Sequence, residues 1–147
     1  MPDAVPGMES GTDGVFERFD RMRSGRRESG TVSDHSPAQE HPPIRQLSAS
    51  ELAALLASGA AVELVDVRTE HERAIAMIAG SRLLDQAYHD ALMLRDRDTA
   101  LVFQCHHGIR SQHAAEYFQK QGFRNLSNLQ GGIDAWSVFV DASVPRY

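Results

Sequence analysis

From residue 44 onward, short apolar runs alternate with segments in which apolar side chains recur every three or four residues. Short apolar runs are typical of buried strands, and the longer spacing is typical of helices with one buried face. The pattern predicts strands at residues 44–47, 62–67, 81–84, 99–104 and 125–129. It predicts one helix between Ser48 and Gly59, and others at residues 69–74, 86–95, 111–121 and 132–139.

The first helix carries clear signals at both ends. Ser48 and Glu51 have the spacing of a capping box, and Leu47 and Leu52 occupy the positions of a hydrophobic staple. Gly59 suits the residue that ends a helix in a left-handed conformation. Because strands that alternate with helices pair in parallel, we expect an α/β fold: a central, mostly parallel five-stranded sheet flanked by helices on both faces. In such sheets the functional site lies at the carboxyl ends of the strands.

The beginning of the chain has a different composition. Residues 1–43 are rich in Gly, Ser, Asp, Glu, Arg and Pro, and bury too little apolar surface to offset the entropy of ordering them. Residues 14–23 are the exception: this stretch is either a short docking helix or a segment that frays. We therefore predict a flexible or partly helical extension at residues 1–43, one domain at 44–139 and a C-terminal tail at 140–147.

Composition and charge argue against several classes of function. The 147 residues suit one domain, and the net charge of −5 offers no broad positive surface for nucleic acid. No apolar run approaches the roughly 20 residues of a membrane span. Acidic residues near the N-terminus do not fit a signal peptide. The single cysteine cannot form an internal disulfide, so we expect a cytoplasmic protein.

The single cysteine, Cys105, follows the strand at residues 99–104 and precedes a helix. Backbone N–H groups at a helix N-terminus stabilise an anion, and the helix dipole adds to this effect. Gly108 allows the loop to turn successive N–H groups inward. Such a position favours the reactive thiolate over an inert thiol. The alternative is a cysteine that only packs at a strand end, which would not require His-His-Gly-Ile-Arg beside it.

Three segments of the chain carry motifs that occur in a fixed order. They are Leu-Val-Asp-Val-Arg-Thr-Glu-His-Glu-Arg at residues 64–73, Cys-His-His-Gly-Ile-Arg-Ser at 105–111 and Leu-Gln-Gly-Gly-Ile-Asp-Ala-Trp at 129–136. In content, order and spacing they resemble the first motif, the active-site loop and the closing motif of rhodanese-like sulfurtransferases. The resemblance covers about residues 44–139 and implies the rhodanese-like version of the α/β fold predicted above.

The resemblance implies an enzyme that moves a sulfane sulfur in two steps. The Cys105 thiolate attacks the outer sulfur of a donor such as thiosulfate, and an acceptor, cyanide or a thiol, then removes that sulfur from the cysteine persulfide. Loop N–H groups would hold the persulfide anion. The other loop and substrate-binding residues that the resemblance implies are His106, His107, Gly108, Ile109, Arg110 and Ser111.

Charged residues around the loop have more specific expected roles. Arg110 is the candidate for binding an anionic donor, and His106 and His107 would add positive charge as the pH approaches their pKa. Asp66 either orients the active-site loop or is a structural carboxylate. Arg68 either adds positive charge near the site or pairs with Glu70 or Glu72, and we favour the structural pairing.

The first motif departs from the family pattern. Residues 76–80 read Ala-Met-Ile-Ala-Gly where family members usually read Gly-His-Ile-Pro-Gly, and the usual aromatic and acidic pair is altered at residues 70–73. We expect these changes to affect the local turn and donor access rather than the sulfur chemistry.

Other chemistries fit this loop less well. Related cysteine phosphatases have five residues between Cys and Arg, whereas four separate Cys105 from Arg110, which makes a smaller cradle and argues against phosphatase or arsenate reductase activity. Cys105, His106, His107 and His113 lack the spacing of structural zinc sites, so we expect no metal and no cofactor.

The expected partners follow from the chemistry. They are a small anionic sulfur donor and a thiol or protein acceptor, with no nucleic acid and no membrane. Two hypotheses compete with an enzyme of this kind: a rhodanese-like binding or regulatory module, and a persulfide carrier with little thiosulfate turnover.

Overall fold

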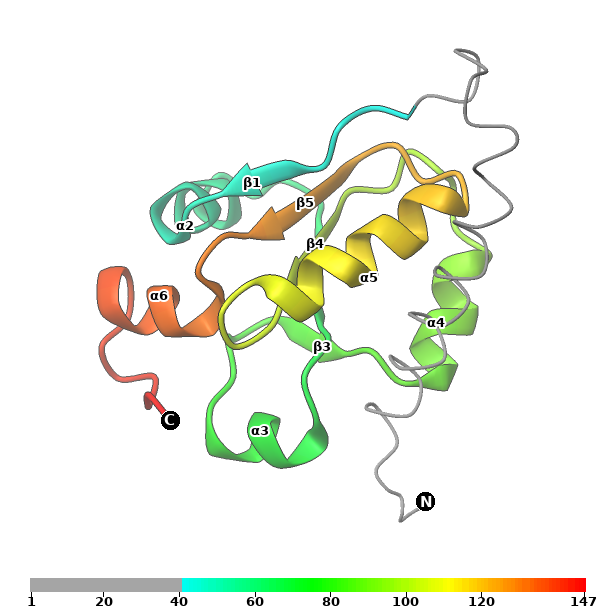
Figure 1. Ribbon diagram of the computed structural model, residues 1–147. Coiled ribbons are helices and arrows are strands. Elements are labelled where there is room, and N and C mark those ends of the chain that lie inside the picture. The colour runs from blue at the N-terminus through cyan, green and yellow to red at the C-terminus, as the bar shows by residue number, and fades with distance from the viewer. Residues whose placement is uncertain (1–40) are drawn as a thin grey trace.

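The computed structural model describes residues 41–147 as a five-stranded sheet with helices on both faces (Figure 1). The predicted extension therefore lies outside the described residues except for residues 41–43, and the helix considered at 14–23 lies wholly outside them. The strands are β1 (Arg45–Leu47), β2 (Glu63–Asp66), β3 (Ser81–Leu83), β4 (Leu101–Gln104) and β5 (Leu126–Leu129). The helices are α2 (Ala49–Ala57), α3 (Glu70–Ile75), α4 (Gln86–Met93), α5 (Ile109–Lys120) and α6 (Gly132–Phe139).

The strands lie in the order β1-β5-β4-β2-β3, and every neighbouring pair among these five is parallel. This confirms the predicted α/β fold, with a sheet that is parallel throughout. β4 occupies the centre, and Gln104 at its end is level with Asp66 of β2. The carboxyl ends of the two strands that lead into Asp66 and Cys105 therefore lie side by side.

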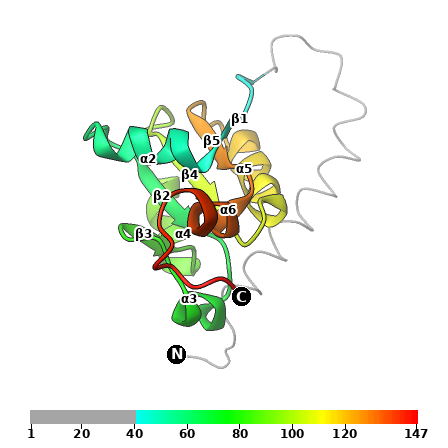
Figure 2. The same cartoon turned by 90° about the vertical axis from the view of Figure 1, so that its left-hand side faces the viewer.

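Helices cover both faces of the sheet, as the alternating pattern predicts. Figure 2 shows the strands in a row, with α2 on one side of the row and α5 on the other. Successive strand residues point to opposite faces, so Leu64 and Val102 join one core cluster while Val65 and Phe103 join the other. The first cluster includes Leu52, Ile133 and Trp136 of α2 and α6, and the second includes Tyr88, Leu92, Ala114 and Phe118 of α4 and α5.

The predicted signals at the first helix are confirmed. Ser48 Oγ accepts the N–H of Glu51 at 3.1 Å, and Glu51 Oε1 accepts the N–H of Ser48 at 2.8 Å. Leu52 is fully buried in the same cluster that Leu47 contacts. Gly59 has a φ of 79°, so it ends the helix in the left-handed region.

The helix after Cys105 begins at Ile109, two residues before the predicted start at Ser111. Gly108 precedes it with a φ of 106° and no side-chain cap. A glycine in this conformation turns the chain directly into a helix, so residues 109 and 110 form the first turn. This earlier start brings the backbone N–H of Ser111 to the loop.

Residues 140–147, which the sequence indicated only as a tail, return to the body of the domain. Val144 is 9% exposed and packs in the cluster that contains Trp136. Ser137 Oγ donates to the carbonyl of Val144. Figure 2 shows the C-terminus beside α3, on the side of the domain that holds the carboxyl ends of the strands.

Within residues 41–147, none of the helices has both the length and the apolar character that crossing a membrane requires.

Candidate active site

The sulfur of Cys105 is buried and surrounded by hydrogen-bond donors. The residue is 1% exposed. Gly108 directs its N–H at Sγ over 3.0 Å, and Ser111 directs its N–H at Sγ over 3.4 Å. The Ser111 hydroxyl lies 3.3 Å from the same sulfur. Donors that converge on one atom favour its negatively charged form, so the site can stabilise an anionic sulfur.

The loop rests on the turn between β5 and α6, and glycine is required at this contact. The N–H of Ile133 donates to the carbonyl of Cys105 at 2.8 Å, and that of Asp134 donates to the carbonyl of His106 at 3.2 Å. Gly132 has a φ of 63°, and a Cβ there would collide with the carbonyl oxygens of Cys105 and His106. The closing motif therefore shapes the cysteine loop by supplying a close backbone surface and two N–H donors.

Asn128 of β5 supports the loop from beneath. Its Oδ1 accepts the Ser111 hydroxyl at 2.6 Å, and its Nδ2 donates to the carbonyl of Gly108 at 3.1 Å. Asn128 is 3% exposed, so these bonds satisfy an otherwise buried amide. Sequence reasoning missed this residue; its signal was a polar side chain in a strand whose other positions are also buried.

Arg110 lies on the first turn of α5 and pairs with Glu72 of α3. Two hydrogen bonds of 2.8 and 2.9 Å join the guanidinium to the two carboxylate oxygens. The hydrogen bonds that Arg110 donates to Glu72 raise the pKa of Arg110, and the charge of Cys105 acts in the same direction. Burial alone would raise the pKa of Glu72, but hydrogen bonds from Arg110, the Thr69 backbone and Tyr147 outweigh it and lower that pKa to about 2.

Asp66 and Arg68 form a fully buried ion pair beside the loop. Arg68 donates to Asp66 through Nε at 2.9 Å and Nη2 at 2.8 Å. Arg73 adds a third bond to Asp66 at 3.0 Å. Asp66 thus meets two arginines rather than the loop, which supports the structural alternative. Arg68 pairs with Asp66, not with the side chains of Glu70 or Glu72 that the sequence suggested.

Arg73 stands in the altered part of the first motif. Besides Asp66, its guanidinium donates to Ser81 Oγ at 2.9 Å and to the Ser81 carbonyl at 2.7 Å. Arg68 in turn donates to the carbonyl of Ala76 at 2.7 Å. Arg73 of this motif therefore belongs to one polar network with Asp66, Arg68 and Ser81 that joins α3 to β3.

Tyr147 closes the other side of the loop. Its ring stacks on His106 with centroids 3.9 Å apart and an interplanar angle of 11°. Its hydroxyl donates to Glu72 at 2.9 Å and accepts from Arg68 at 3.0 Å. Burial, opposed by the bond from Arg68 and assisted by that to Glu72, raises the pKa of Tyr147 to about 12. No motif pointed to this residue.

The two histidines of the loop stack on each other with centroids 3.9 Å apart. Burial lowers the pKa of His106, and the neighbouring His107 lowers it further. His106 therefore gains its positive charge only at a lower pH than an unperturbed histidine does.

One group of possible metal ligands occurs among residues 41–147, namely His106, His107 and Asp134, whose ligand atoms lie within 4.8 Å of one another. Imidazole lone pairs lie in the ring planes, and stacked rings do not direct them at a common point. Both Asp134 oxygens also accept from Arg146, at 2.8 and 3.1 Å. These residues do not form a metal site in this arrangement.

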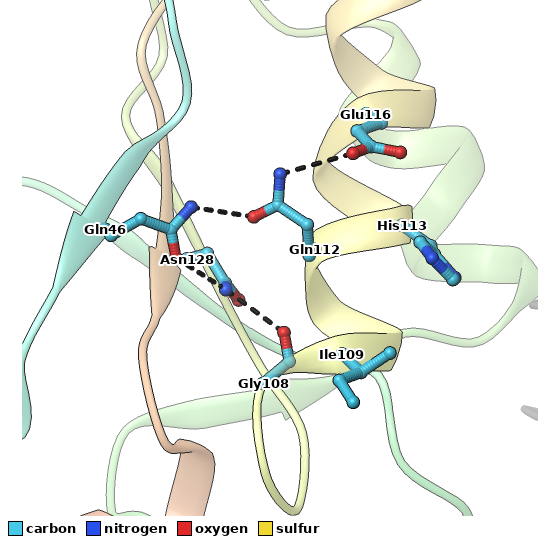
Figure 3. Close-up of a pocket in the computed structure, with 7 residues that line it drawn as sticks. All are labelled: Gln46, Gly108, Ile109, Gln112, His113, Glu116 and Asn128. Atoms are coloured by element: carbon cyan, nitrogen blue, oxygen red, sulfur yellow. Dashed lines mark hydrogen bonds between the residues drawn. The ribbon is translucent and has the colours of Figure 1, made fainter.

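A cavity of about 300 Å³ lies beside the loop, between α5 and the strands β1 and β5 (Figure 3). Gly108 and Ile109 form its end nearest the loop, and amide side chains line much of its wall. Ile109 is 69% exposed, so a partner molecule can reach this loop residue. The sulfur of Cys105 does not line this cavity.

The structure therefore brings together most of the predicted site residues and adds others. Gly108 and Ser111 contact the sulfur of Cys105. Arg110 lies close enough for its charge to interact with that of Cys105. Asp66 and Arg68 lie behind this group. The residues that sequence reasoning did not place in the site are Glu72, Asn128, Gly132 and Tyr147.

Comparison with known proteins identifies the family. The family profile described as Rhodanese-like domain matches residues 48–138. The chain is 38% identical over 94 residues to the thiosulfate sulfurtransferase GlpE of Ectopseudomonas mendocina, covering 63% of this chain and 84% of that protein. It is 40% identical over 75 residues to GlpE of Pseudomonas aeruginosa, covering 50% and 68%. A crystal structure of a rhodanese-like domain protein from Staphylococcus aureus superposes with a TM-score of 0.57 and 27% identity, covering 71% of this chain and 99% of that one. This chain belongs to the rhodanese-like domain family.

Proposed function

We propose that the protein is a thiosulfate sulfurtransferase in which Cys105 carries the transferred sulfur as a persulfide. The relatives named thiosulfate sulfurtransferase support this choice of reaction and of donor. The observation that carries the proposal is the convergence of the Gly108 and Ser111 backbone N–H groups on a single buried sulfur.

The first step is a displacement at sulfur. The Cys105 thiolate attacks the outer sulfur of thiosulfate and forms a new S–S bond. The S–S bond of the donor breaks, and sulfite leaves with the bonding electron pair. The enzyme then holds a persulfide with its negative charge on the outer sulfur, and no external oxidant or reductant is consumed.

The second step regenerates the thiolate. A nucleophilic acceptor, cyanide in an assay or a thiol in the cell, attacks the outer sulfur and forms thiocyanate or a new persulfide. The electron pair of the breaking bond returns to Cys105, where the loop N–H groups stabilise it. The two half-reactions predict ping-pong kinetics.

Arg110 supplies a fixed positive charge for the anionic donor. Its Coulombic interaction with Cys105 supports this role. Glu72 holds the guanidinium in place and neutralises part of its charge, so we infer that donor binding depends on the pair rather than on a free arginine. A reduced thiol is needed at both steps, which favours the cytoplasm as the location.

The loop length distinguishes this reaction from phosphatase chemistry. Four residues separate Cys105 from Arg110, one fewer than in the related cysteine phosphatases. The shorter loop suits a single sulfur atom.

A steady-state assay with thiosulfate and cyanide tests the proposal. We expect thiocyanate formation that requires Cys105, with parallel lines in double-reciprocal plots at several cyanide concentrations. Cys105→Ser should abolish turnover, while Leu94→Ala, which alters an exposed side chain outside the loop, serves as the control for handling and folding. Thiocyanate formation by Cys105→Ser at the unaltered rate would overturn the proposal.

A further inference from the structure

The Ser111 hydroxyl has one proton and two acceptors within reach. The Oδ1 of Asn128 lies 2.6 Å away, and the Sγ of Cys105 lies 3.3 Å away. We propose that Asn128 is a positioning residue that withholds this proton from the sulfur and thereby raises the pH at which Cys105 becomes reactive. The inference deepens the proposed function, because it concerns control of the same sulfur.

The orientation of the Asn128 amide is fixed by its other contacts. Its Nδ2 donates to the carbonyl of Gly108 at 3.1 Å and to Oε1 of Gln46 at 3.0 Å. A backbone carbonyl can only accept, so the NH₂ group must face Gly108. The Oδ1 atom then faces Ser111, and it can only accept a hydrogen bond from the Ser111 hydroxyl.

Further amide side chains extend this chain of hydrogen bonds away from the sulfur. Gln46 Nε2 donates to Gln112 Oε1 at 2.8 Å, and Gln112 Nε2 donates to Glu116 Oε2 at 3.3 Å (Figure 3). The carboxylate of Glu116 is an acceptor, so it fixes the direction of this chain of hydrogen bonds at its far end. In each hydrogen bond of this chain, from Ser111 to Glu116, the donor is the residue nearer to Cys105.

The consequence for the sulfur follows from the hydroxyl's geometry. With its proton directed at Asn128, Ser111 Oγ presents a lone pair to Cys105. A lone pair can accept from a thiol but repels a thiolate, so this arrangement favours the protonated sulfur. The backbone N–H groups of Gly108 and Ser111 remain the donors that serve the anion.

Several charged or titratable groups lie around the loop. They lie on α3, the loop and α5, α6, the end of β2 and the C-terminal segment: Glu72, His106, His107, Arg110, Asp134, Asp66, Arg68 and Tyr147. None of them is changed in the test below, so their direct effects are the same in every protein compared.

The test is a double-mutant cycle measured by the rate of iodoacetamide alkylation of Cys105 against pH. The four proteins are the wild type, Asn128→Ala, Ser111→Ala and the double variant. Because the chain has one cysteine, alkylation reports on Cys105 alone. The assay needs no sulfur donor, so its result is independent of whether thiosulfate is the substrate.

We expect Asn128→Ala to lower the pH midpoint of alkylation by about one unit, since the freed hydroxyl can then donate to the thiolate. In the Ser111→Ala background, the same substitution should not change the midpoint. If Asn128 only supports the loop through Gly108, Asn128→Ala would shift the pH midpoint equally in the wild-type and Ser111→Ala backgrounds. This result would overturn the proposal.

Ser111→Ala alone provides a second test if Asn128→Ala does not fold. With the hydroxyl proton committed to Asn128, its removal should move the midpoint by less than about half a unit and should not raise it. A rise of about one unit or more would mean that the hydroxyl already serves the sulfur, which contradicts the proposal.

Discussion

Arg110 and Glu72 face each other across the carboxyl edge of the sheet and share two hydrogen bonds of 2.8 and 2.9 Å. The same carboxylate caps α3 by accepting the Thr69 N–H at 3.0 Å, and it accepts the Tyr147 hydroxyl at 2.9 Å. One side chain thus ties together the cysteine loop, α3 and the C-terminal segment. Its charge and its hydrogen bonds lead to separate predictions.

Replacing Glu72 with Gln should improve binding of an anionic donor. Gln suits the same position of a capping box and can still accept from Arg110, but it removes the negative charge that opposes the guanidinium. We expect the KM for thiosulfate to fall about two- to fivefold, as the loss of one partly screened charge suggests. Glu70→Gln, on the same helix without a bond to Arg110, is the control. An unchanged or higher KM in Glu72→Gln would contradict the role given to Arg110.

The Glu72 carboxylate should also stabilise the fold in a pH-dependent manner. Its pKa is lowered from the ordinary 4.5 to about 2, so the folded state binds a proton less readily than the unfolded state. The stabilisation is present above pH 4.5 and is lost as the pH falls towards 2. Chemical denaturation of wild type and Glu72→Gln should therefore give a difference in unfolding free energy that shrinks over this range. A difference that stays constant down to pH 2 would be inconsistent with the lowered pKa.

Gly132 should be needed for the shape of the cysteine loop. A Cβ at this position collides with the carbonyl oxygens of Cys105 and His106, so Gly132→Ala must displace the loop. A misplaced nucleophile can reduce kcat/KM about a hundredfold, and we expect a loss of that order. Gly59→Ala is a matched control, because Gly59 also has a positive φ, of 79°, but has open space around its Cβ position. Equal activity losses in the two variants would indicate backbone strain rather than loop displacement.

The sequence was sufficient for the α/β fold and for the position of the cysteine loop. Strand and helix periodicities are local, and the capping residues Ser48 and Glu51 act within one turn. The helix start was misplaced because the conformation of Gly108 depends on packing against the turn after β5. Asn128 and Tyr147 were missed because their partners are distant in sequence: Ser111 lies 17 residues from Asn128, and Glu72 lies 75 residues from Tyr147.

The roles of Asp66 and Arg68 depended on the same kind of information. From sequence, a carboxylate at a strand end can face the loop or an arginine with equal ease. The structure shows the buried Asp66 between Arg68 and Arg73, because α3 places Arg73 within 3.0 Å of the carboxylate. Local motifs identify such residues, but only the tertiary arrangement selects their partners.

Tyr147 should stabilise the domain through its hydroxyl as well as through its ring. Tyr147→Phe keeps the stack on His106 but loses the bonds to Glu72 and Arg68, and we expect it to lower the unfolding free energy by about 1 kcal/mol. Tyr147→Ala should cost more, because it also removes the stack. Urea denaturation measures both. Wild-type stability in both variants would show that the C-terminal segment does not hold the loop.

The central claim is that Cys105 carries the sulfur, and intact-mass spectrometry tests it most directly. After incubation with thiosulfate and removal of excess donor, the wild-type protein should be one sulfur atom heavier, and cyanide should return it to its original mass with release of thiocyanate. Cys105→Ser should show no change under the same conditions. Persulfide that forms but turns over slowly would identify a sulfur carrier with another donor or acceptor. A wild-type protein whose mass does not change with thiosulfate, although its thiol is free to alkylate, would contradict the account.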